Sequence, residues 1–585
     1  MASSLRDIPG ATPPRRTHGR TRRARPTVGG YRPVLFDPSA GRRLPGRLPN
    51  RRKQLFGRRR RPDLFIVALV VGSLGLAAYL YLAAHDANAV TAGISGVEDG
   101  AILTAEAAAD LEVVLRVETE DQLELAVVSL DGVPLEDPEV DDLAFWWRPD
   151  PEEPLRDGTH VFELAVPRAL NGTKVTTRTF TVDGTAPRLT VPALLPAAPV
   201  DAPVTVTGEV EPGTTLTLGG EEVPTVDGRF DVAFPHPPAG PLRFEATDAA
   251  GNTSRADAVV PVAYPGCRGI HVSAAAWDND ELRQGVLDLI EAEKVDCVEL
   301  DLKDEAGIIG HRTSVPLAEE IGASQSMYEL EDAVDDLHGR GVRVVGRLVA
   351  FRDPVLAQAA WARGDEDWVI QTRDGEPLPS YGGFTNFAHP DVRAYNLAIA
   401  VEAADAGVDE VLWDYIRRPE GALDEMVFPG LEGDVKASIV DFLAEVHPEL
   451  RSRGVLQGVS VFGIAASRPD PVGQDVPAIA RNADYIAPMV YPSLWVSGEY
   501  GVDDPKSMPY EIVTASLKDF QVSVEGTGAT LVPWLQHFDL GHVYGPAEIR
   551  AQRQAASDLG IDDFLLWSPR VRYHPEGLDA VPAEG

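Results

Sequence analysis

The chain has 585 residues, too many for a single hydrophobic core, which predicts a multidomain protein of three or four folded units. Its net charge of −37 is unevenly divided, because residues 1–62 hold 18 of the 53 basic residues and only 2 of the 90 acidic residues. The other residues carry 35 basic and 88 acidic side chains, a balance that repels phosphate and excludes nucleic acid as a partner of the main body.

The basic segment 1–62 is rich in arginine, proline and glycine and has almost no periodic apolar positions. Such a composition cannot repay the entropy lost on folding, so we expect a disordered cytoplasmic segment. In the simplest interpretation its arginines only set the membrane topology. Binding to anionic lipid or to nucleic acid in the cytoplasm is the alternative.

A run of 21 uncharged residues, Leu64–Ala84, predicts one transmembrane helix within 63–85. As a helix it would rise about 31 Å, close to the roughly 30 Å hydrocarbon core of a bilayer. Arg58–Arg61 precede the run and Asp86 follows it, so the N-terminus is expected in the cytoplasm and the C-terminal domains outside the membrane. The length of the run favours an uncleaved anchor over a cleaved signal peptide.

Residues 88–186 and 187–264 show short alternating strands between turns. This pattern predicts two β-sandwich modules of immunoglobulin-like type. The second, which ends in ATDAAGNTS, resembles small β-sandwich repeats that accompany bacterial carbohydrate-active enzymes and adhesins. We expect both modules to act as spacers or packing partners, and direct sugar binding is the alternative.

In residues 265–575 strand and helix patterns alternate, as parallel βα units require. Eight strands are expected, at Gly269–Ser273, Cys297–Lys303, Arg343–Phe351, Glu410–Ile416, Leu456–Ile464, Tyr485–Pro492, Thr530–Phe538 and Phe564–Pro569. Helical patterns lie between them, at Glu281–Glu293, Tyr328–Arg340, Val392–Ala406, Val435–Arg453, Tyr510–Val524 and Ala547–Leu559. This order predicts a TIM barrel followed by a tail, 576–585. An open doubly wound sheet is the alternative, but no glycine-rich phosphate loop follows any strand.

Two cysteines, Cys267 and Cys297, lie just before the first and at the start of the second expected barrel strand. These strands would be neighbours, so a disulfide is geometrically plausible in an oxidising location. Two unpaired buried thiols are the alternative. Neither cysteine has metal-ligand or nucleophile spacing.

The stretch GVDEVLWDYIRRPEG, at Gly407–Gly421, combines strand-forming residues with a charged end. Successive side chains of a strand alternate between its faces, so Val411 and Trp413 point one way and Asp414 the other. If helices cover the Trp413 side, Asp414 projects into the barrel near the carboxyl end of its strand, where TIM barrels carry their chemistry. Pairing with a nearby arginine, purely to hold the loop, is the alternative.

The second expected strand, in VELDLKDEAG, has an apolar face and a charged face made by Glu299, Asp301 and Lys303. A wholly charged inward face is expensive to bury and is usually kept for a site. Asp301 and Lys303 would approach the barrel mouth, with Asp304 and Glu305 in the loop beyond. An internal Asp–Lys ion pair that plugs the barrel is the alternative.

Aromatic, arginine and glutamine side chains gather at the expected ends of the other strands. Such a set matches a sugar site, because pyranose rings stack on flat apolar faces and hydroxyls need polar partners. The substrate-binding candidates are Lys303, Arg347, Asp353, Tyr415, Arg417, Tyr491, Trp534, Gln536 and Trp567. Any one tryptophan alone would more often belong to a core.

Other reaction classes find less support in the sequence. The first barrel strand has a lone His271 in GIHVS, and no cluster has metal-ligand spacing. The G-x-S-x-G nucleophile elbow of serine hydrolases is also absent. Carboxylate chemistry therefore remains, with no metal and no cofactor expected.

The pieces ELDLKDEAG, GRLVAFRDP, AVEAADAGVDEVLWDYIRRP, YIAPMVYPSLW, VPWLQHF and GIDDFLLWSPRVRY resemble, in this order, a bacterial family of glycoside-hydrolase-like TIM barrels long classified as a domain of unknown function. The resemblance covers over half of the chain and implies a barrel of carbohydrate-active ancestry. Two departures bear on substrate choice: Arg417-Arg418-Pro419 stands where the family tends to have Arg-Phe-Pro, and Trp567-Ser568 where it has Trp-Asn.

These features predict a membrane-anchored extracytoplasmic glycoside hydrolase that acts on a cell-envelope or extracellular polysaccharide through two carboxyl groups. Asp414 is the expected general acid, and Asp301 or Asp304 the base or nucleophile. The second and fourth strands lie about 10 Å apart, which is compatible with retaining or inverting chemistry. A non-catalytic glycan-binding or envelope scaffolding protein is the alternative.

Overall fold

The computed structural model describes residues 64–87, 90–136, 138–168 and 172–581. The predicted basic segment 1–62 lies outside these residues. The chain divides into two compact units, Met1–Ala83 and Ala84–Gly585, and each is described by itself.

The apolar run forms one continuous helix, α1 (Leu64–Ala87). Large apolar side chains along it are exposed, among them Leu74 and Leu82. Within the described residues, no helix combines the length and the apolar character needed to cross a membrane. The membrane span therefore stays a prediction.

Two sheets follow, with strands ordered β1-β3-β7-β6 and β2-β9-β8-β4-β5. Val113 and Leu115 of one sheet share a buried cluster with Phe162 and Phe180 of the other, which is the packing of a β-sandwich. The strands are β1 (Gly93–Ser95), β2 (Ala101–Leu103), β3 (Val113–Arg116), β4 (Val127–Leu130), β5 (Val133–Pro134), β6 (Glu139–Asp141), β7 (Ala144–Trp147), β8 (Gly158–Pro167) and β9 (Thr173–Val182). Two short helices, α2 (Ala105–Ala109) and α3 (Glu120–Leu125), were not expected; each begins after a capping threonine.

A smaller pair of sheets comes next, with strands ordered β10-β11-β14 and β13-β12-β15-β16. Val206 and Phe230 of the first sheet pack with Leu216 and Phe244 of the second in one core. The strands are β10 (Leu189–Thr190), β11 (Val204–Val210), β12 (Thr215–Leu218), β13 (Glu221–Glu222), β14 (Arg229–Phe234), β15 (Leu242–Thr247) and β16 (Thr253–Ala258).

Nine of the remaining strands form a closed parallel barrel of eight strand positions, as predicted. The ring runs β17 (Arg268–Val272), β18 (Cys297–Lys303), β21 (Arg343–Val349), β23 (Glu410–Asp414), β25 (Leu456–Phe462), β26 (Tyr485–Met489), β27 and β28 (Thr530–Leu531 and Trp534–Gln536), and β29 (Phe564–Trp567). It closes because β17 pairs with both β18 and β29. The seventh position is split in two around Pro533, which has no N–H to give to a sheet ladder.

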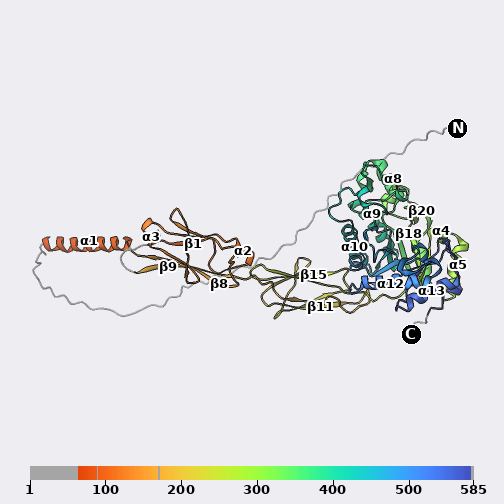
Figure 1. The fold of residues 1–585 in the computed structure, drawn as a ribbon, viewed down its shortest axis with the longest axis horizontal. Coiled ribbons are helices and arrows are strands. Elements are labelled where there is room, and N and C mark those ends of the chain that lie inside the picture. The colour runs from red at the N-terminus through yellow and green to blue at the C-terminus, as the bar shows by residue number, and fades with distance from the viewer. Residues whose placement is uncertain (1–63, 88–89, 137, 169–171, 582–585) are drawn as a thin grey trace, which may run out of the picture. The chain divides into compact units, whose positions relative to one another are not determined.

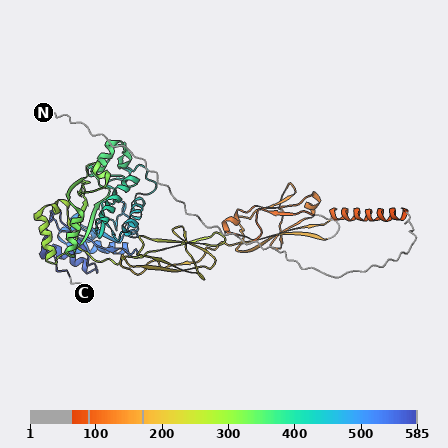
Figure 2. The same ribbon diagram turned by 180° about the vertical axis from the view of Figure 1, so that it is seen from behind.

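Helices lie outside the strands of this barrel (Figure 1, Figure 2). Those at the predicted places are α5 (Asp280–Glu291), α7 (Leu330–Gly339), α9 (Pro390–Asp405), α10 (Val435–Arg451), α12 (Pro509–Val524) and α13 (Pro546–Ser557). The barrel also contains elements that the periodicity did not predict: α4 (Ala274–Asp278), β19 (Ile309–His311), α6 (Pro316–Glu320), β20 (Ser324–Tyr328), α8 (Pro354–Arg363), β22 (Gln371–Thr372), β24 (Met426–Val427) and α11 (Val476–Ala480).

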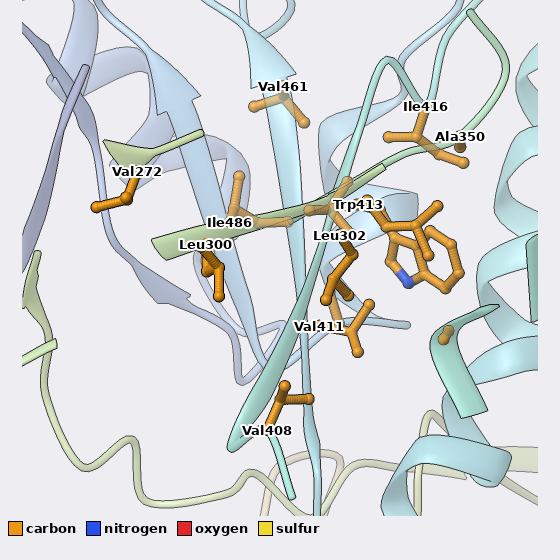
Figure 3. Packing of buried hydrophobic residues seen from close by; sticks show 14 of the residues in the cluster. Val272, Leu300, Leu302, Ala350, Val408, Val411, Trp413, Ile416, Val461 and Ile486 are labelled. Atoms are coloured by element: carbon orange, nitrogen blue, oxygen red, sulfur yellow. The ribbon is translucent and has the colours of Figure 1, made fainter. Parts of the chain in front are cut away.

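The largest core fills the space between the barrel strands and the helices, as the side chains in Figure 3 show. Trp413 of β23 points outward into this core, with its ring centroid 5.2 Å from that of Phe442 in α10. Leu412, its neighbour, points the other way and joins a second cluster inside the barrel. The alternation predicted for this strand is therefore correct, and it directs Asp414 inward.

The barrel interior is filled by its own cluster of side chains rather than hollow. Val345, Tyr485, Trp534 and Leu565 belong to it, each from a different strand. Gly458 of β25 makes room for this packing, because a Cβ atom there would lie 2.0 Å from the Tyr485 ring. The interior packing leaves the carboxyl end of the barrel for polar side chains.

Cys267 and Cys297 form a disulfide with a Cα–Cα distance of 5.4 Å. The bond links the residue before β17 to the first residue of β18, which are neighbouring strands. Of the two alternatives that the sequence left open, the structure has the bonded one.

Candidate active site

Arg347, on the inner face of β21, is the centre of a charged cluster at the carboxyl ends of the strands. Its side chain is buried, with 1% exposed. Nη1 donates to Asp301 Oδ1 at 2.7 Å, and Nη2 donates to Glu305 and, at 2.6 Å, to Asp414 Oδ2. We call Arg347, Asp301, Glu305 and Asp414 the Arg347 cluster.

Asp414 is the last residue of β23 and is 4% exposed. Its Oδ2 also accepts from Arg347 Nε at 2.9 Å, and its Oδ1 accepts from the backbone N–H of Tyr415 at 2.7 Å. Glu305 and Asp414 share the Nη2 atom as donor, so their bonded oxygens lie no more than about 6 Å apart. The alternative for the second strand, an ion pair between Asp301 and Lys303, is not what the structure has, because Asp301 and Asp414 are both bound to Arg347.

His271 of β17 lies beside this cluster. Its Nδ1 is 2.6 Å from Glu299 Oε2, a hydrogen bond, and its Nε2 is 3.8 Å from Asp301 Oδ2. Trp567 at the end of β29 stacks on the imidazole, with 3.9 Å between ring centroids. The Arg347 guanidinium lies 4.8 Å from the Trp567 ring centroid, so one indole contacts both the guanidinium and the imidazole.

Two carboxyl groups of the Arg347 cluster have pKa values shifted in opposite directions. Burial, only partly offset by Arg347 and His271, raises the pKa of Asp301 to about 7. Burial also opposes ionisation of Glu305, but the charge and hydrogen bond of Arg347 outweigh it and lower its pKa to about 2. Near neutral pH, one carboxyl can therefore hold a proton while its neighbour is ionised.

Burial and two neighbouring carboxyl groups, Glu299 and Asp301, change the pKa of His271. Burial opposes protonation of His271, but Glu299 and Asp301 outweigh it and raise its pKa. Its imidazole is therefore disposed to carry a proton between two carboxylates.

Asp304, the other predicted catalytic residue, does not join the Arg347 cluster. Its Oδ1 accepts from the backbone N–H groups of Ala306 and Ile308, at 2.9 and 3.0 Å. These bonds close the turn after β18, so the structure gives Asp304 a local role. Glu305, the next residue, takes the position that was expected for Asp304.

Lys303 and Asp353, both predicted to bind substrate, form a separate buried ion pair. Lys303 Nζ is 2.8 Å from Asp353 Oδ2 and 2.8 Å from Asn396 Oδ1 of α9, and both charged side chains are fully buried. The pairing of β18 with β21 shifts by one residue between Asp301 and Lys303, a β-bulge that re-aims the lysine. The expectation that Lys303 faces the barrel mouth is therefore wrong.

Three further candidates are packed among other side chains, and two of them, Tyr491 and Trp534, belong to the cluster inside the barrel. Tyr491 packs against Phe538 with 5.5 Å between centroids, and Trp534 Nε1 donates to Ser460 Oγ at 3.0 Å. Gln536 is fully buried; it accepts from the Ser493 N–H and donates to the Ser493 hydroxyl and the Phe538 carbonyl. Trp567 alone among the predicted tryptophans contacts the charged groups.

Tyr415 and Arg417 follow Asp414 directly and belong to a second group at the same end of the barrel. The Arg417 guanidinium lies 4.8 Å from the Tyr415 ring centroid, and its Nη2 is 3.1 Å from Glu420. Arg352 donates to the Tyr415 hydroxyl at 2.8 Å, and its guanidinium lies 4.8 Å from the Tyr381 ring centroid. We call Arg352, Tyr381, Tyr415, Arg417 and Glu420 the Arg–Tyr group.

The sequence did not select Glu299, Glu305 and His271 as site residues. Glu299 shares the inner face with Asp301 by strict alternation, which is a usable signal. His271 was set aside because it has no second ligand nearby in sequence, yet its partners come from the adjacent strand. Glu305 carries no periodic signal, because it lies in a turn.

His271, Glu299 and Asp301 offer one ligand atom each, all within 4.8 Å of one another. Such a set could hold a cation, and Glu299 Oε1 is buried without a hydrogen-bond partner. However, Arg347 Nε is 3.9 Å from Glu299 Oε1 and already brings a positive charge there. A cation at this position would therefore lie beside the Arg347 guanidinium, although Glu299 Oε1 has no hydrogen-bond donor of its own.

A cavity of about 850 Å³ lies elsewhere, beside α9 and the β19–α6 loop. Glu402 in its wall accepts hydrogen bonds from His311, Thr313 and Ser314, so the carboxylate joins α9 to that loop. The charged groups with shifted pKa described above are not in its lining. We therefore base the candidate site on the Arg347 cluster rather than on this cavity.

A closed ring of eight parallel strand positions with helices outside it is a TIM barrel, and the Arg347 cluster lies at the carboxyl ends of the strands, where TIM-barrel enzymes carry their chemistry. The family described as "Putative glycosyl hydrolase domain" matches residues 269–573, more than half of the chain. The chain belongs to this family, and its barrel is that of a glycan-acting hydrolase. No protein among the curated sequences matches the chain.

Solved structures are similar to parts of the chain. A hypothetical protein from Ruminiclostridium thermocellum is 27% identical over 32% of this chain and 96% of its own, with a TM-score of 0.29. The glycoside hydrolase domain of PgaB (BpsB) from Bordetella bronchiseptica is 14% identical over 52% and 95%, with a TM-score of 0.40. An endo-1,4-beta-D-mannanase from Thermotoga petrophila is 14% identical over 52% and 88%, with a TM-score of 0.35. Because these TM-scores are below 0.5, the family match alone identifies the class.

Proposed function

We propose that the protein is a membrane-anchored, extracytoplasmic glycoside hydrolase that cleaves a cell-envelope or extracellular polysaccharide by acid/base chemistry. The observation that carries the proposal is the Arg347 cluster, in which one guanidinium holds three carboxyl groups from two strands and a loop. Glycoside hydrolysis needs one protonated and one ionised carboxyl group within several ångströms of each other. The cluster supplies both kinds.

In this proposal Asp301 is the proton donor and Glu305 the ionised base or nucleophile. The raised pKa of Asp301 and the lowered pKa of Glu305 support this division. Asp301 would protonate the glycosidic oxygen as the bond to the anomeric carbon breaks. Glu305, whose side chain is 29% exposed, is the most accessible carboxylate of the cluster and would attack that carbon or activate a water.

Asp414 has a positioning role in this assignment, because its Oδ2 accepts from two nitrogens of Arg347. The sequence-based alternative makes Asp414 itself the general acid. The two assignments differ in which variant loses the proton donor, so a single set of substitutions distinguishes them.

The test compares Asp301→Asn, Glu305→Gln and Asp414→Asn in the full-length protein, with release of reducing ends from purified wall glycans as the readout. We expect the first two variants to lose about 10²- to 10⁴-fold in turnover. Asp304→Asn is the matched control, because its side chain only closes a turn and asparagine can accept the same bonds. Full activity of both Asp301→Asn and Glu305→Gln would refute the proposal.

A non-catalytic glycan-binding or scaffolding protein is the second candidate function. It is favoured by one observation: the side chains of Asp301 and Asp414 are only 4% and 5% exposed and are both bound to Arg347. Glycan binding measured by calorimetry without any new reducing ends would establish this alternative.

The anchor belongs to the proposal on the evidence of the uncharged run Leu64–Ala84, its helical conformation and the basic residues before it. Placement outside the cytoplasm agrees with the disulfide between Cys267 and Cys297. Carbonate extraction of membranes, followed by protease treatment of intact cells, tests it. Release by carbonate, or protection of the barrel from protease in cells whose outer layers are permeable to it, would contradict the anchor or its orientation.

A further inference from the structure

Arg352, just beyond β21, is a cation without an acidic partner. Among the described residues no carboxylate lies within 4.0 Å of it, although most arginines of the barrel have one. Its guanidinium lies 4.8 Å from the Tyr381 ring centroid and 5.0 Å from that of Tyr415. Its one described hydrogen bond runs from Nη1 to the Tyr415 hydroxyl, and its Nε is buried with no partner.

A second arginine lies near the same tyrosine ring. The Arg417 guanidinium is 4.8 Å from the Tyr415 ring centroid and 5.2 Å from that of Phe462. Glu420 pairs with Arg417 and is the carboxylate of the group, so the Arg–Tyr group holds two positive charges against one negative. This excess is that of the five residues themselves, since Asp414 and Glu305 of the neighbouring Arg347 cluster also act electrostatically on Tyr415.

Both tyrosines of the group have a left-handed backbone, with φ of 54° at Tyr381 and 47° at Tyr415. Bulky residues rarely adopt this conformation, and local strain of this kind clusters at ligand sites. Tyr381 is also 45% exposed, so a flat ring is available to solvent beside the Arg352 charge. An exposed aromatic face next to an unpaired arginine can hold a sugar ring and a charged substituent together.

The group adjoins the Arg347 cluster, because Tyr415 follows Asp414 in the chain and its N–H donates to Asp414. A sugar unit bound at the Arg–Tyr group would therefore belong to the same glycan chain that reaches the Arg347 cluster.

We propose that the Arg–Tyr group is a subsite for an anionic sugar unit, so that the substrate is an acidic glycan. The inference rests on the proposed function, because a subsite presupposes a glycan substrate. Its test, however, measures binding alone. Arg352 and Arg417 bind the anionic substituent, a carboxylate or a phosphate, and Tyr381 stacks on the ring. Glu420 opposes the anion and restricts its approach to the Arg352 side.

The test is calorimetry on the full-length protein with three probes of similar length: an oligogalacturonate, a neutral cello-oligosaccharide and an oligomer of glycerol phosphate. We expect at least one anionic probe to bind at least tenfold more tightly than the neutral one, with an affinity that falls as salt rises. The carboxylated and phosphorylated arms identify which substituent the subsite prefers.

Arg352→Gln should reduce the affinity for the anionic probe about tenfold or more and leave the neutral probe unchanged. Arg352→Lys keeps the charge and should lose less. The matched control is Arg363→Gln, since Arg363 also lies over an aromatic ring, Trp368 at 5.4 Å, but is paired with Glu320 and Asp365. The melting temperature of each variant shows whether it has folded.

Equal or absent binding of anionic and neutral probes, or unchanged affinity in a folded Arg352→Gln variant, would overturn the inference. Charge-dependent binding without cleavage of any glycan would instead remove the hydrolase proposal and leave the subsite intact. Cleavage of neutral glycans with no preference for charge would remove the subsite proposal and leave the hydrolase proposal intact.

Discussion

Arg347 is the residue on which the site depends, because a single buried guanidinium compensates carboxylates at Asp301, Glu305 and Asp414. The carboxyl groups among them that are ionised are stable in a buried site only while that cation is present. Arg347 both stabilises the fold and positions the carboxyl groups. Its substitution should therefore destabilise the protein, in addition to any effect on catalysis.

Arg347→Met is expected to lower the free energy of unfolding by about 3–5 kcal/mol, since it leaves buried carboxylates unpaired. Urea denaturation followed by circular dichroism measures the change. Arg363→Gln, on the protein surface, is the control and should cost less than about 1 kcal/mol. An Arg347→Met barrel as stable as the parent would show that the carboxylates are protonated or solvated.

The proton on Asp301 gives the activity a defined pH dependence. Its pKa is raised to about 7, and a general acid must be protonated, so kcat/KM should fall as pH rises through about 7. A pH profile between 5 and 9, measured on the parent, on Asp301→Asn and on Asp414→Asn, locates this limb. If the limb vanishes only in Asp414→Asn, the proton belongs to Asp414.

For single residues, the sequence correctly predicts which way side chains point in regular strands, but not at bulges and turns. Alternation correctly placed Asp414, Asp301 and Arg347 on the inner face, because strand geometry alone determines it. It failed for Lys303, where a one-residue bulge reverses the alternation, and it made no prediction for Glu305, whose place is determined by the turn after β18. Such local irregularities depend on tertiary packing and leave no periodic trace in the sequence.

The long β18–α7 connection is the element that departs most from a plain βα unit. It contains β19, α6 and β20 and is held to α9 by Glu402, whose carboxylate accepts from Thr313 and Ser314. Burial opposes ionisation, but the hydrogen bonds from His311, Thr313 and Ser314 lower the pKa of Glu402 to about 2. The ionised Glu402 side chain therefore adds an attachment to α9, beside the pairing of β19 with β18 and the hydrogen bond from the Tyr328 hydroxyl to the Asp301 carbonyl.

Glu402→Gln is expected to lower the free energy of unfolding by about 1.5–3 kcal/mol at neutral pH, because it removes charge-assisted hydrogen bonds. The lowered pKa means that this stabilisation is complete above pH 4.5, the ordinary value, and is lost as pH falls toward 2. Thermal unfolding at pH 7 and pH 3 measures it. A difference between parent and variant that stays constant between these pH values would contradict the assignment.

The eight strands and six main helices could be predicted because each βα unit repeats the same pattern of apolar residues, first that of a strand and then that of a helix. The elements inside the connections, such as β19 and α8 (Pro354–Arg363), could not, since they are short and their partners lie far away in sequence. The split of the seventh strand could have been predicted from Pro533, whose ring removes a ladder donor.

In the molecule as a whole, the bond between Cys267 and Cys297 joins two strands across a loop of 30 residues. Closing a loop of this size is expected to stabilise the barrel by about 3–4 kcal/mol, mostly by restricting the unfolded chain. A reducing agent should therefore lower the melting temperature of the parent. The double variant Cys267→Ser, Cys297→Ser should start lower and not respond to reductant; equal response of both proteins would mean that the thiols are free in solution.

Barrel closure has a consequence for how the protein is made. The first strand, β17, must pair with β29, in which Phe564 is the partner of Arg268. The ring therefore cannot close until Phe564 has been synthesised. Nearly the whole barrel sequence must leave the ribosome, and in the proposed location also cross the membrane, before the native state is attainable. A chain that stops short of Phe564 would present two unpaired strand edges, and such edges recruit other chains into aggregates.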